Sequence, residues 1–151
     1  ILELGIGSGV TLQDLDFKIQ GLKDQGITNI QLIGIANQYS PHWNNLSKDI
    51  TIIYDDWKYL DQYLEKESVD FIYSHFGLHN VTEQMGKELR NYLTGPLQSI
   101  LKLDGQLVFN YRATMREALR DLEGYKVERI LPQGVQEVIS LTKVSSVSPS
   151  T

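Results

Sequence analysis

Three glycines at alternating positions near the start of the chain are its clearest chemical signal. Gly5, Gly7 and Gly9 follow directly on residues 1–4 (ILEL), a short apolar run typical of a buried strand. Glycine lets the backbone turn tightly at a strand end without placing a side chain in the way of a ligand. Main-chain N–H groups and the start of a following helix can then hold a nucleotide-type ligand. The sequence therefore predicts a binding loop at residues 5–9.

The glycine spacing separates two kinds of nucleotide site. A dinucleotide-binding fingerprint reads G-x-G-x-x-G, but here the third glycine comes one residue early and position 10 is Val10. Glu3 lies two residues before the first glycine, which gives E-x-G-x-G-x-G. This arrangement resembles the first motif of class I S-adenosylmethionine-dependent methyltransferases. A tight strand–helix turn that binds no ligand would leave the same glycine pattern.

Composition narrows the function classes. A length of 151 residues predicts one domain with a sizeable core. The net charge of −5 and the absence of a basic run argue against a non-specific nucleic-acid binder. The lack of cysteine excludes a disulfide, a thiolate zinc site and a cysteine nucleophile. No apolar segment approaches the ~20 residues that cross a bilayer, and there is no signal-peptide pattern. We expect a cytoplasmic protein.

Strand and helix patterns alternate along most of the chain. Apolar or β-branched runs predict strands, and apolar residues at helical spacing predict helices. Ser40 followed by Pro41 predicts the start of a short helix, and Asp104 with Gly105 predicts a turn. The predicted strands are 1–4, 29–36, 50–54, 69–74, 106–111, 124–131 and 135–143, and the predicted helices are 10–25, 57–66, 81–103 with breaks at Gly86 and at Gly95-Pro96, and 113–122.

This alternation predicts an α/β fold. Apolar strands separated by helices form a doubly wound, mostly parallel sheet with helices on both faces. No helix separates the last two strands, so we expect them to pair antiparallel at one edge. Residues 1–144 would form the domain and residues 145–151 a polar tail. Five strand–helix units with an antiparallel last strand resemble the seven-stranded class I methyltransferase fold.

The resemblance implies that S-adenosylmethionine is the cofactor. In that family Glu3 would help to hold the amino group of the cofactor, and the backbone of Gly5, Ile6, Gly7 and Gly9 would approach its methionine part. Alternatively, the Glu3 carboxylate accepts N–H groups of the loop itself. Family members also carry helices before the first strand. The present chain begins at Ile1, without Met and already inside a strand, so we interpret its numbering as that of an excerpt.

The second strand departs from the family pattern. An acidic residue usually accepts both ribose hydroxyls at its end, but the sequence here continues into Asn37 and Gln38. Either amide oxygen could accept one hydroxyl, and a neutral acceptor bonds more weakly than a charged one. After the third strand, Asp56 with Trp57 best fits the adenine contact, and Asp55 is one position away. Asp56 could equally cap the helix that begins near Trp57.

Chemistry at the methyl acceptor would fall to the segment after the fourth strand. The resemblance places Ser74 and His75 beside the cofactor, and His79 lies in the following loop. His75 and His79 are candidate general bases because histidine titrates near neutral pH. Their i, i+4 spacing would suit a metal only on a helix, and with no third ligand evident we predict no metal. Tyr111 and Arg112 could face the acceptor or the solvent.

Two functions remain open from the sequence. The first is methyl transfer to a small molecule, or less readily to a protein side chain. The segment after the fourth strand reads SHFG and lacks the N/D-P-P-Y/F motif of amino-base methylation, which disfavours nucleic-acid bases. The second is a catalytically degenerate, methyltransferase-like binding or regulatory module, favoured by the missing carboxylate. A partner chain or an upstream segment could close the site, and no membrane partner is expected. A nicotinamide-binding Rossmann domain fits less well, since it needs glycine at position 10 and an acid after the second strand.

Overall fold

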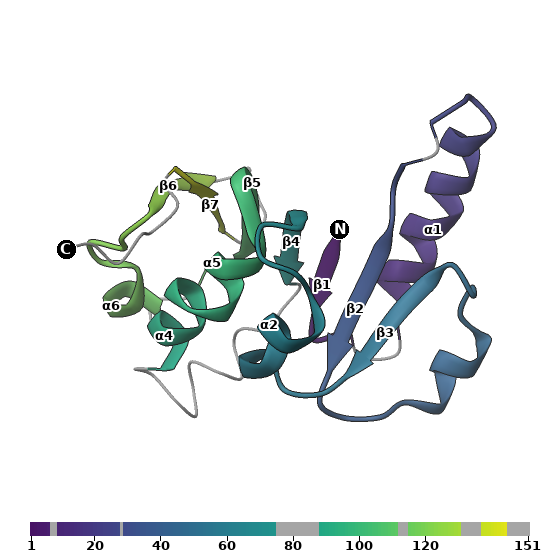
Figure 1. Ribbon diagram of the computed structural model, residues 1–151, viewed down its shortest axis with the longest axis horizontal. Coiled ribbons are helices and arrows are strands. Elements are labelled where there is room, and N and C mark those ends of the chain that lie inside the picture. Colours follow the sequence, from purple (N-terminus) through teal and green to yellow (C-terminus); the bar gives the residue numbers. More distant parts are fainter. Residues whose placement is uncertain (7–8, 28, 75–87, 112–114, 131–136, 145–151) are drawn as a thin grey trace.

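A seven-stranded sheet organises the described part of the chain (Figure 1). The computed structural model describes residues 1–6, 9–27, 29–74, 88–111, 115–130 and 137–144. The elements are β1 (Leu2–Leu4), α1 (Val10–Lys23), β2 (Leu32–Ala36), the 3₁₀ helix η1 (Pro41–Asn45), β3 (Ile50–Tyr54), the 3₁₀ helix η2 (Trp57–Tyr59), α2 (Leu60–Tyr63), β4 (Val69–Ser74), α4 (Glu88–Thr94), α5 (Pro96–Ile100), β5 (Leu101–Asn110), α6 (Arg116–Leu119), β6 (Tyr125–Ile130) and β7 (Val138–Lys143).

The strand order is β3-β2-β1-β4-β5-β7-β6. The strands β1 to β5 are parallel to one another, and β7 is antiparallel to both β5 and β6. The order reverses between β1 and β4, the switch point outside which open α/β sheets bind ligands. The predicted α/β class and the antiparallel pair of closing strands are confirmed. The strands β3 and β4 have the predicted bounds.

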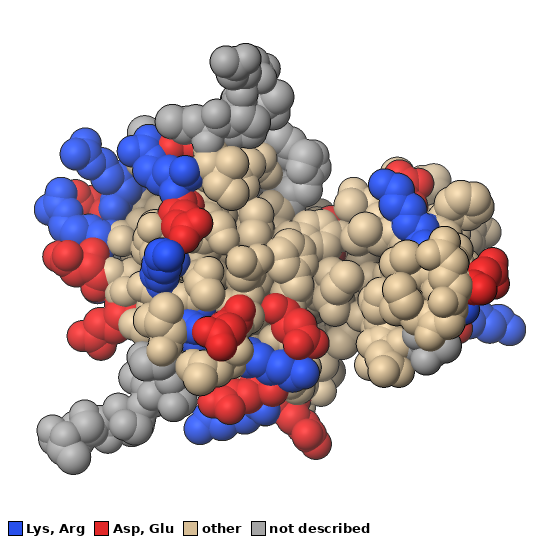
Figure 2. All heavy atoms as spheres, turned by 90° about the horizontal axis from the view of Figure 1, so that it is seen from above, with Lys and Arg blue, Asp and Glu red and all other residues tan. Residues whose placement is uncertain are grey.

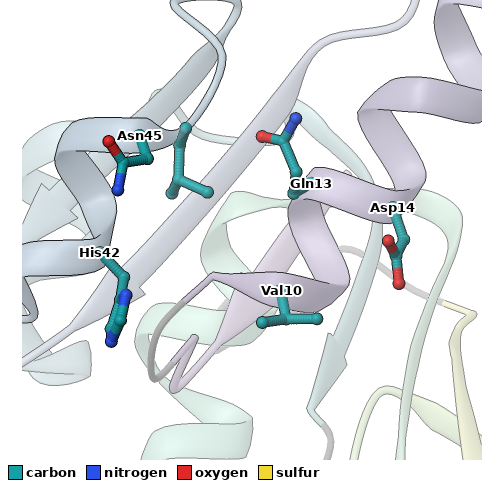
Figure 3. Close-up of a pocket in the computed structure, with 6 residues that line it drawn as sticks. Val10, Gln13, Asp14, His42 and Asn45 are labelled. Carbon is teal, nitrogen blue, oxygen red and sulfur yellow. The ribbon is translucent and has the colours of Figure 1, made fainter.

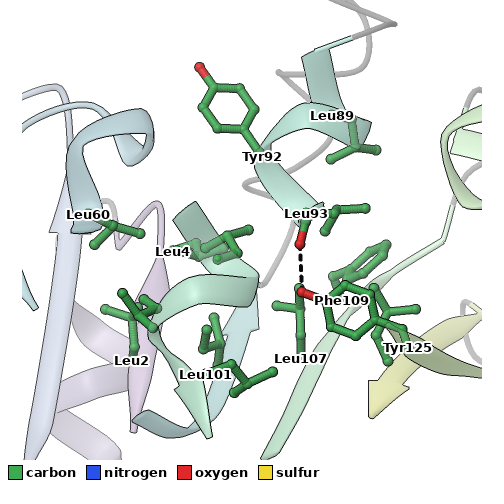
Figure 4. Packing of buried hydrophobic residues seen from close by; sticks show 14 of the residues in the cluster. Leu2, Leu4, Leu60, Leu89, Tyr92, Leu93, Leu101, Leu107, Phe109 and Tyr125 are labelled. Carbon is green, nitrogen blue, oxygen red and sulfur yellow. Dashed lines mark hydrogen bonds between the residues drawn. The ribbon is translucent and has the colours of Figure 1, made fainter. Parts of the chain in front are cut away.

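Helices cover both faces of the sheet, as predicted. On one face α1 buries Leu12 and Ile19 against β2 and β3, in a cluster with Leu32 and Ile50. On the other face α2, α4, α5 and α6 pack on the strands through a larger cluster that includes Leu2, Leu4, Leu60, Leu93, Leu107 and Phe109 (Figure 4). Figure 1 shows α1 standing apart from these four helices. The two clusters lie on opposite faces because successive residues of a strand point to opposite sides.

Several helices and strands are shorter than predicted. The segment 57–66 becomes the 3₁₀ turn η2 followed by α2, which ends at Tyr63, and α6 extends only over Arg116–Leu119. The helix α1 ends at Lys23, and β2 begins at Leu32 rather than at residue 29. Ser40 caps η1 as expected, because its Oγ accepts the N–H of His42 at 3.3 Å.

The prediction around residues 101–105 was wrong. Leu101–Leu103 belong to β5 rather than to a helix, and Asp104-Gly105 lies inside that strand instead of forming a turn before it. The pairing moves from Val69 opposite Leu101 to Phe71 opposite Gln106, so β5 accommodates extra residues in a bulge. Asp104 takes the left-handed conformation there, with φ of 66°. A bulge uses the same residue types as a turn, and only the pairing with β4 distinguishes them.

Some sequence predictions fall outside the described residues. These are Gly7, His75, His79, Gly86, Arg112 and the tail at 145–151. Among the described residues, no helix has the length and apolar character needed to cross a membrane.

Candidate functional site

The predicted cofactor residues follow neighbouring strands at one edge of the sheet. Glu3 lies in β1, Asn37 follows β2, Asp56 follows β3, and Ser74 ends β4. Because these four strands are adjacent and parallel, their carboxyl ends meet at that edge. Backbone hydrogen bonds tie the exits together: Gly5 N donates to Ile35 O at 2.9 Å, and Asp55 N donates to Ala36 O at 3.0 Å. The tertiary fold thus gathers residues that lie about 70 positions apart.

The glycine loop leads directly into α1. Gly5 and Gly9 have φ of 70° and 88°, a conformation that side chains other than glycine's rarely adopt. Gly9 is the N-cap of α1 and has no side chain to cap it. By helix geometry the N–H groups of the first turn, from Val10 onward, have no carbonyl partner within the helix. Such N–H groups at a helix start can bind an anionic ligand group.

Glu3 is the most unusual residue of the site. Its side chain is 3% exposed, and its Oε1 atom has no hydrogen-bond partner. Burial raises the pKa of its carboxyl to about 7, and the Tyr73 hydroxyl acts in the opposite direction. Three N–H groups of the loop do not donate to this carboxylate, because Gly5 and Ile6 donate to Ile35 O and Gly9 donates to Ile6 O. A buried acid with an unused oxygen fits a ligand that brings its own cationic donor.

The sequence analysis missed Tyr73 on β4. Glu3 and Tyr73 are paired across β1 and β4 and therefore share one face of the sheet. The Tyr73 hydroxyl is buried and, like Glu3 Oε1, has no well-formed hydrogen bond. Burial and the adjacent Glu3 raise the pKa of Tyr73, so it remains a protonated donor. The available signal was a hydroxyl on a mostly apolar strand, but its meaning required knowing that β4 lies beside β1.

Asn37 and Gln38 are both exposed directly after β2. Both side chains are therefore open to a ligand at the strand exit, and the ribose contact stays a prediction. A neutral amide oxygen stands at the edge where a carboxylate would make stronger, charge-assisted hydrogen bonds.

The two aspartates after β3 are engaged in different ways. Asp56 caps η2, because its Oδ1 accepts the N–H of Lys58 at 3.0 Å, and the same atom accepts the Tyr92 hydroxyl at 3.3 Å. The capping alternative is thus confirmed. Asp55 accepts the Tyr63 hydroxyl and the N–H of Asp56, and these bonds lower the pKa of its carboxyl, with Tyr63 the larger cause. The carboxyl of Asp56 is half-buried at the edge of the site.

Trp57 and Ser74 face the interior rather than open solvent. Trp57 packs against the large core cluster, with its ring 6.2 Å from that of Tyr92 in an edge-to-face arrangement. Ser74 is buried, and its Oγ donates to Leu4 O at 3.4 Å. Tyr111 also packs against the core, and Arg129 lies 5.2 Å over its ring. Within the described part of the chain, no group of three or more His, Asp or Glu residues could hold a metal ion.

A shallow hollow of about 300 Å³ adjoins the glycine loop (Figure 3). It lies between the first turns of α1 and η1 and is lined by Val10, Gln13, Asp14, His42, Asn45 and Leu46. Gln13 already has a partner within the protein, since its Oε1 accepts the N–H of Ser47 at 3.1 Å. None of the six lining residues is a predicted cofactor-binding residue. The hollow therefore borders the candidate site without coinciding with it.

Charges on the face drawn in Figure 2 are interspersed. Lys and Arg side chains alternate there with Asp and Glu, and among the residues described they do not gather into one basic area on this face. Among the described residues, exposed ion pairs join Lys126 to Glu128 at 3.1 Å and Arg120 to Glu117 at 3.4 Å. This distribution differs from the basic stripe that nucleic-acid binding favours.

Comparison with known proteins identifies the fold. No protein-family model and no curated protein sequence matches the chain. Solved structures do match. An S-adenosylmethionine-dependent methyltransferase from Mesorhizobium loti has a TM-score of 0.64 at 14% identity, over 94% of this chain and 89% of that one. A putative S-adenosyl-L-methionine-dependent methyltransferase from Methanococcus maripaludis has a TM-score of 0.62 at 15% identity, over 97% of this chain and 78% of that one. TrmN from Thermus thermophilus has a TM-score of 0.65 at 16% identity, over 95% of this chain and 43% of that one, so the chain spans less than half of that protein. With its strand order and antiparallel β7, the chain has the class I S-adenosylmethionine-dependent methyltransferase fold.

Proposed function

We propose that this chain binds S-adenosylmethionine at the carboxyl ends of β1 to β4 and takes part in methyl transfer to a small molecule. One observation carries the proposal. Glu3 is buried at the switch point of the sheet with an unpartnered oxygen, beside a glycine loop that leads into α1, whose N-cap Gly9 makes no side-chain hydrogen bond to the first-turn N–H groups. An amino-acid moiety supplies the ammonium and the carboxylate that these groups complement. The methyltransferase fold of the solved neighbours supports the same ligand.

In this proposal each residue contacts a different part of the ligand. Glu3 accepts from the amino group, and the backbone of Gly5, Ile6 and Gly9 lies along the methionine part. Asn37 accepts a ribose hydroxyl, and Asp56 accepts from the adenine amino group while Trp57 and Ser74 shape the wall. Gly7 would complete the loop, and His75 and His79 stay candidate general bases, although all three lie outside the described residues.

The demands on the protein are modest. The cofactor supplies a methyl group on an already activated sulfonium, so alignment of the acceptor supplies most of the rate enhancement. A general base is needed only where the acceptor must lose a proton. The interspersed charges on the face drawn in Figure 2 and the acidic balance of the chain favour a small acceptor over a nucleic acid.

The second candidate is a catalytically degenerate binding or regulatory module. Two observations favour it: the neutral Asn37 at the ribose position, and the two donors, Lys58 N and the Tyr92 hydroxyl, that already occupy Oδ1 of Asp56. One solved neighbour is a Haloferax volcanii complex between the Trm112 methyltransferase activator and a putative methyltransferase, with a TM-score of 0.53 at 16% identity over 95% of this chain and 82% of that one. A partner chain that completes the site would fit this candidate.

Calorimetric titration with S-adenosylhomocysteine tests the proposal, because this product needs no acceptor. We expect micromolar binding, strengthened about tenfold in Asn37→Asp by a charge-assisted hydrogen bond. Gln38→Glu is the matched control, since it adds the same charge one position further along. Equal strengthening in both variants would indicate a general electrostatic effect, and strengthening in Gln38→Glu alone would move the ribose contact to residue 38. Absence of binding at millimolar ligand would refute the cofactor assignment.

Turnover distinguishes the two candidate functions. Purified chain is incubated with S-adenosylmethionine and pools of small-molecule nucleophiles, and formation of S-adenosylhomocysteine is measured. Binding together with acceptor-dependent product supports the enzyme. Binding without product in any pool, with or without added cell extract as a source of partner chain, supports the module.

A further inference from the structure

Glu3 and Tyr73 form an isolated polar pair inside the sheet. They lie opposite each other on β1 and β4, and neither Glu3 Oε1 nor the Tyr73 hydroxyl has a well-aligned hydrogen bond. The Tyr73 ring is held from its own strand by Phe71, with ring centroids 6.1 Å apart. A buried polar pair without full hydrogen bonding costs free energy, so the pair calls for an explanation beyond stability.

Little around the pair can neutralise a carboxylate. On β2 the residue opposite Glu3 is Gly34, which has no side chain. On α1 the buried acid is Asp16, which accepts from Gln20 Nε2 at 3.2 Å. The backbone nitrogen of Ile1 is engaged elsewhere, since it donates to Gln31 O at 2.9 Å. Within the described part of the chain, no Lys, Arg or His side chain forms an ion pair with Glu3.

The protonation state of Glu3 follows from these surroundings. Burial raises the pKa of its carboxyl to about 7, so near neutral pH a large fraction of molecules carries a proton there. The Tyr73 hydroxyl lowers that pKa because it can donate to the charged form. Burial of the Tyr73 phenol, helped by the neighbouring Glu3, raises its own pKa, so Tyr73 acts as a donor and does not itself ionise.

We propose that binding of the cofactor's amino-acid moiety at this edge is coupled to loss of the Glu3 proton to solvent, and that Tyr73 is a positioning residue that sets the pH range of binding. The inference rests on the proposed function. In the bound state the Glu3 carboxylate accepts N–H hydrogen bonds from the ligand ammonium on one side and the O–H of Tyr73 on the other. The O–H proton of Glu3 leaves to solvent, and no covalent bond forms.

The size of the effect follows from proton linkage. Only the ionised fraction of Glu3 is competent to bind, so affinity falls as the pH drops below about 7. Between about pH 7.5 and about pH 5.5 the dissociation constant should rise roughly 25-fold. At about pH 6, binding should release about 0.9 proton, and at about pH 7.5 about 0.2 proton.

Calorimetry on the full chain measures both quantities with S-adenosylhomocysteine as the probe. Titrations cover about pH 5.5 to about pH 7.5, and the Glu3→Gln variant corrects for the ligand's own amino group, which begins to ionise at the upper end of this range. Each is run in two buffers of different ionisation enthalpy, and the difference in observed heat gives the number of protons released. Glu3→Gln should remove both the pH dependence and the proton release.

Tyr73→Phe tests the positioning role. Removing the hydroxyl should raise the pKa of Glu3 and shift the binding profile to higher pH. At about pH 7.5 the affinity should then fall severalfold while the number of protons released increases. Tyr125→Phe is the matched control, because the Tyr125 hydroxyl is also buried but donates to Leu93 O at 2.6 Å, away from Glu3 (Figure 4). This control should keep the pH profile of the unsubstituted chain even if its stability falls.

The outcomes separate this inference from the proposed function. Binding with a flat pH profile, or with no proton release, overturns the inference and leaves the cofactor assignment intact. Absence of binding at every pH overturns the proposed function and the coupling with it. Carbon-13 NMR of the glutamate carboxyls, with Glu3 assigned by Glu3→Gln, provides a test without ligand. A Glu3 titration midpoint near 4.5 in the free chain would also overturn the inference.

Discussion

Replacement of Gly9 by alanine should destabilise the chain through two separable causes. Gly9 has φ of 88°, and the left-handed conformation costs an alanine ~1–2 kcal/mol. A Cβ atom at Gly9 would also lie 2.6 Å from Cδ1 and 3.2 Å from Cδ2 of Leu46. Relief of this overlap requires the Leu46 side chain to shift, which we put at ~1 kcal/mol. We therefore expect Gly9→Ala to lower the free energy of unfolding by ~2–3 kcal/mol.

Two other glycines separate the causes. Gly26 has φ of 92°, but a Cβ atom there would meet nothing within 4 Å. Gly26→Ala should cost only the backbone strain, ~1–2 kcal/mol. Gly21 lies inside α1 without a positive φ and also in open space, so Gly21→Ala should stabilise the chain by ~0.5–1 kcal/mol. The three variants make the same chemical change in three different surroundings.

Urea denaturation followed by tryptophan fluorescence measures the three free energies, and thermal unfolding provides a check at ~2–4 °C per kcal/mol. Leu46→Ala should partly rescue Gly9→Ala, so that the double variant is ~1 kcal/mol more stable than the sum of the single changes predicts. If Gly9→Ala costs no more than Gly26→Ala, or if the double variant is additive, the close packing of the glycine loop against Leu46 is refuted.

Three further predictions concern other buried or capping side chains. Lys143→Met should lower the free energy of unfolding by ~2–3 kcal/mol, because Lys143 is 3% exposed and donates to two backbone carbonyls at 2.8 Å. Lys102→Met, at an exposed ion pair, should lower it by less than ~1 kcal/mol. Comparable urea midpoints for the two variants would contradict this. Because the pKa of Glu3 is raised in the folded state, the free energy of unfolding should fall by up to ~3 kcal/mol as the pH rises from 4.5 to about 7, and then level off. If Glu3→Gln shows the same dependence of stability on pH, Glu3 is not its cause. Asp56→Ala should cost ~1 kcal/mol through loss of the cap on η2, whereas Asp56→Asn, which keeps the acceptor for Lys58 N and Tyr92, should cost about half of that; equal losses in thermal unfolding would argue against the capping role.

The sequence predicted the elements whose signal is local. β3 and β4 are short β-branched or aromatic runs with clear polar limits, and their predicted bounds are those of the structure. Ser40-Pro41 and the glycine loop are likewise local, since a side-chain cap and a backbone turn depend on residues only a few positions apart. These features sufficed for the α/β class and for the resemblance.

The tertiary structure decided what depends on neighbouring strands. Residues 101–105 resemble the end of a helix and a turn, but pairing with β4 makes them part of a bulged strand, where Leu101 O accepts a hydrogen bond from Lys143. A lysine near the end of the last strand gives no local sign that it will be buried among carbonyls about 40 residues away. Burial and pairing are properties of the assembled sheet, and propensity yields to them.

The candidate site shows the same division. The residue types of Glu3, Asn37 and Asp56 and their places at strand ends could be predicted from the sequence. The sequence could not show that Glu3 is buried with an unused oxygen, or that Tyr73 is its neighbour, because both follow from β4 inserting beside β1 across some 70 residues. Chain composition fixed which groups are available, whereas the strand order fixed which of them share a low-dielectric interior, and it is that sharing which shifts a pKa and prepares a site.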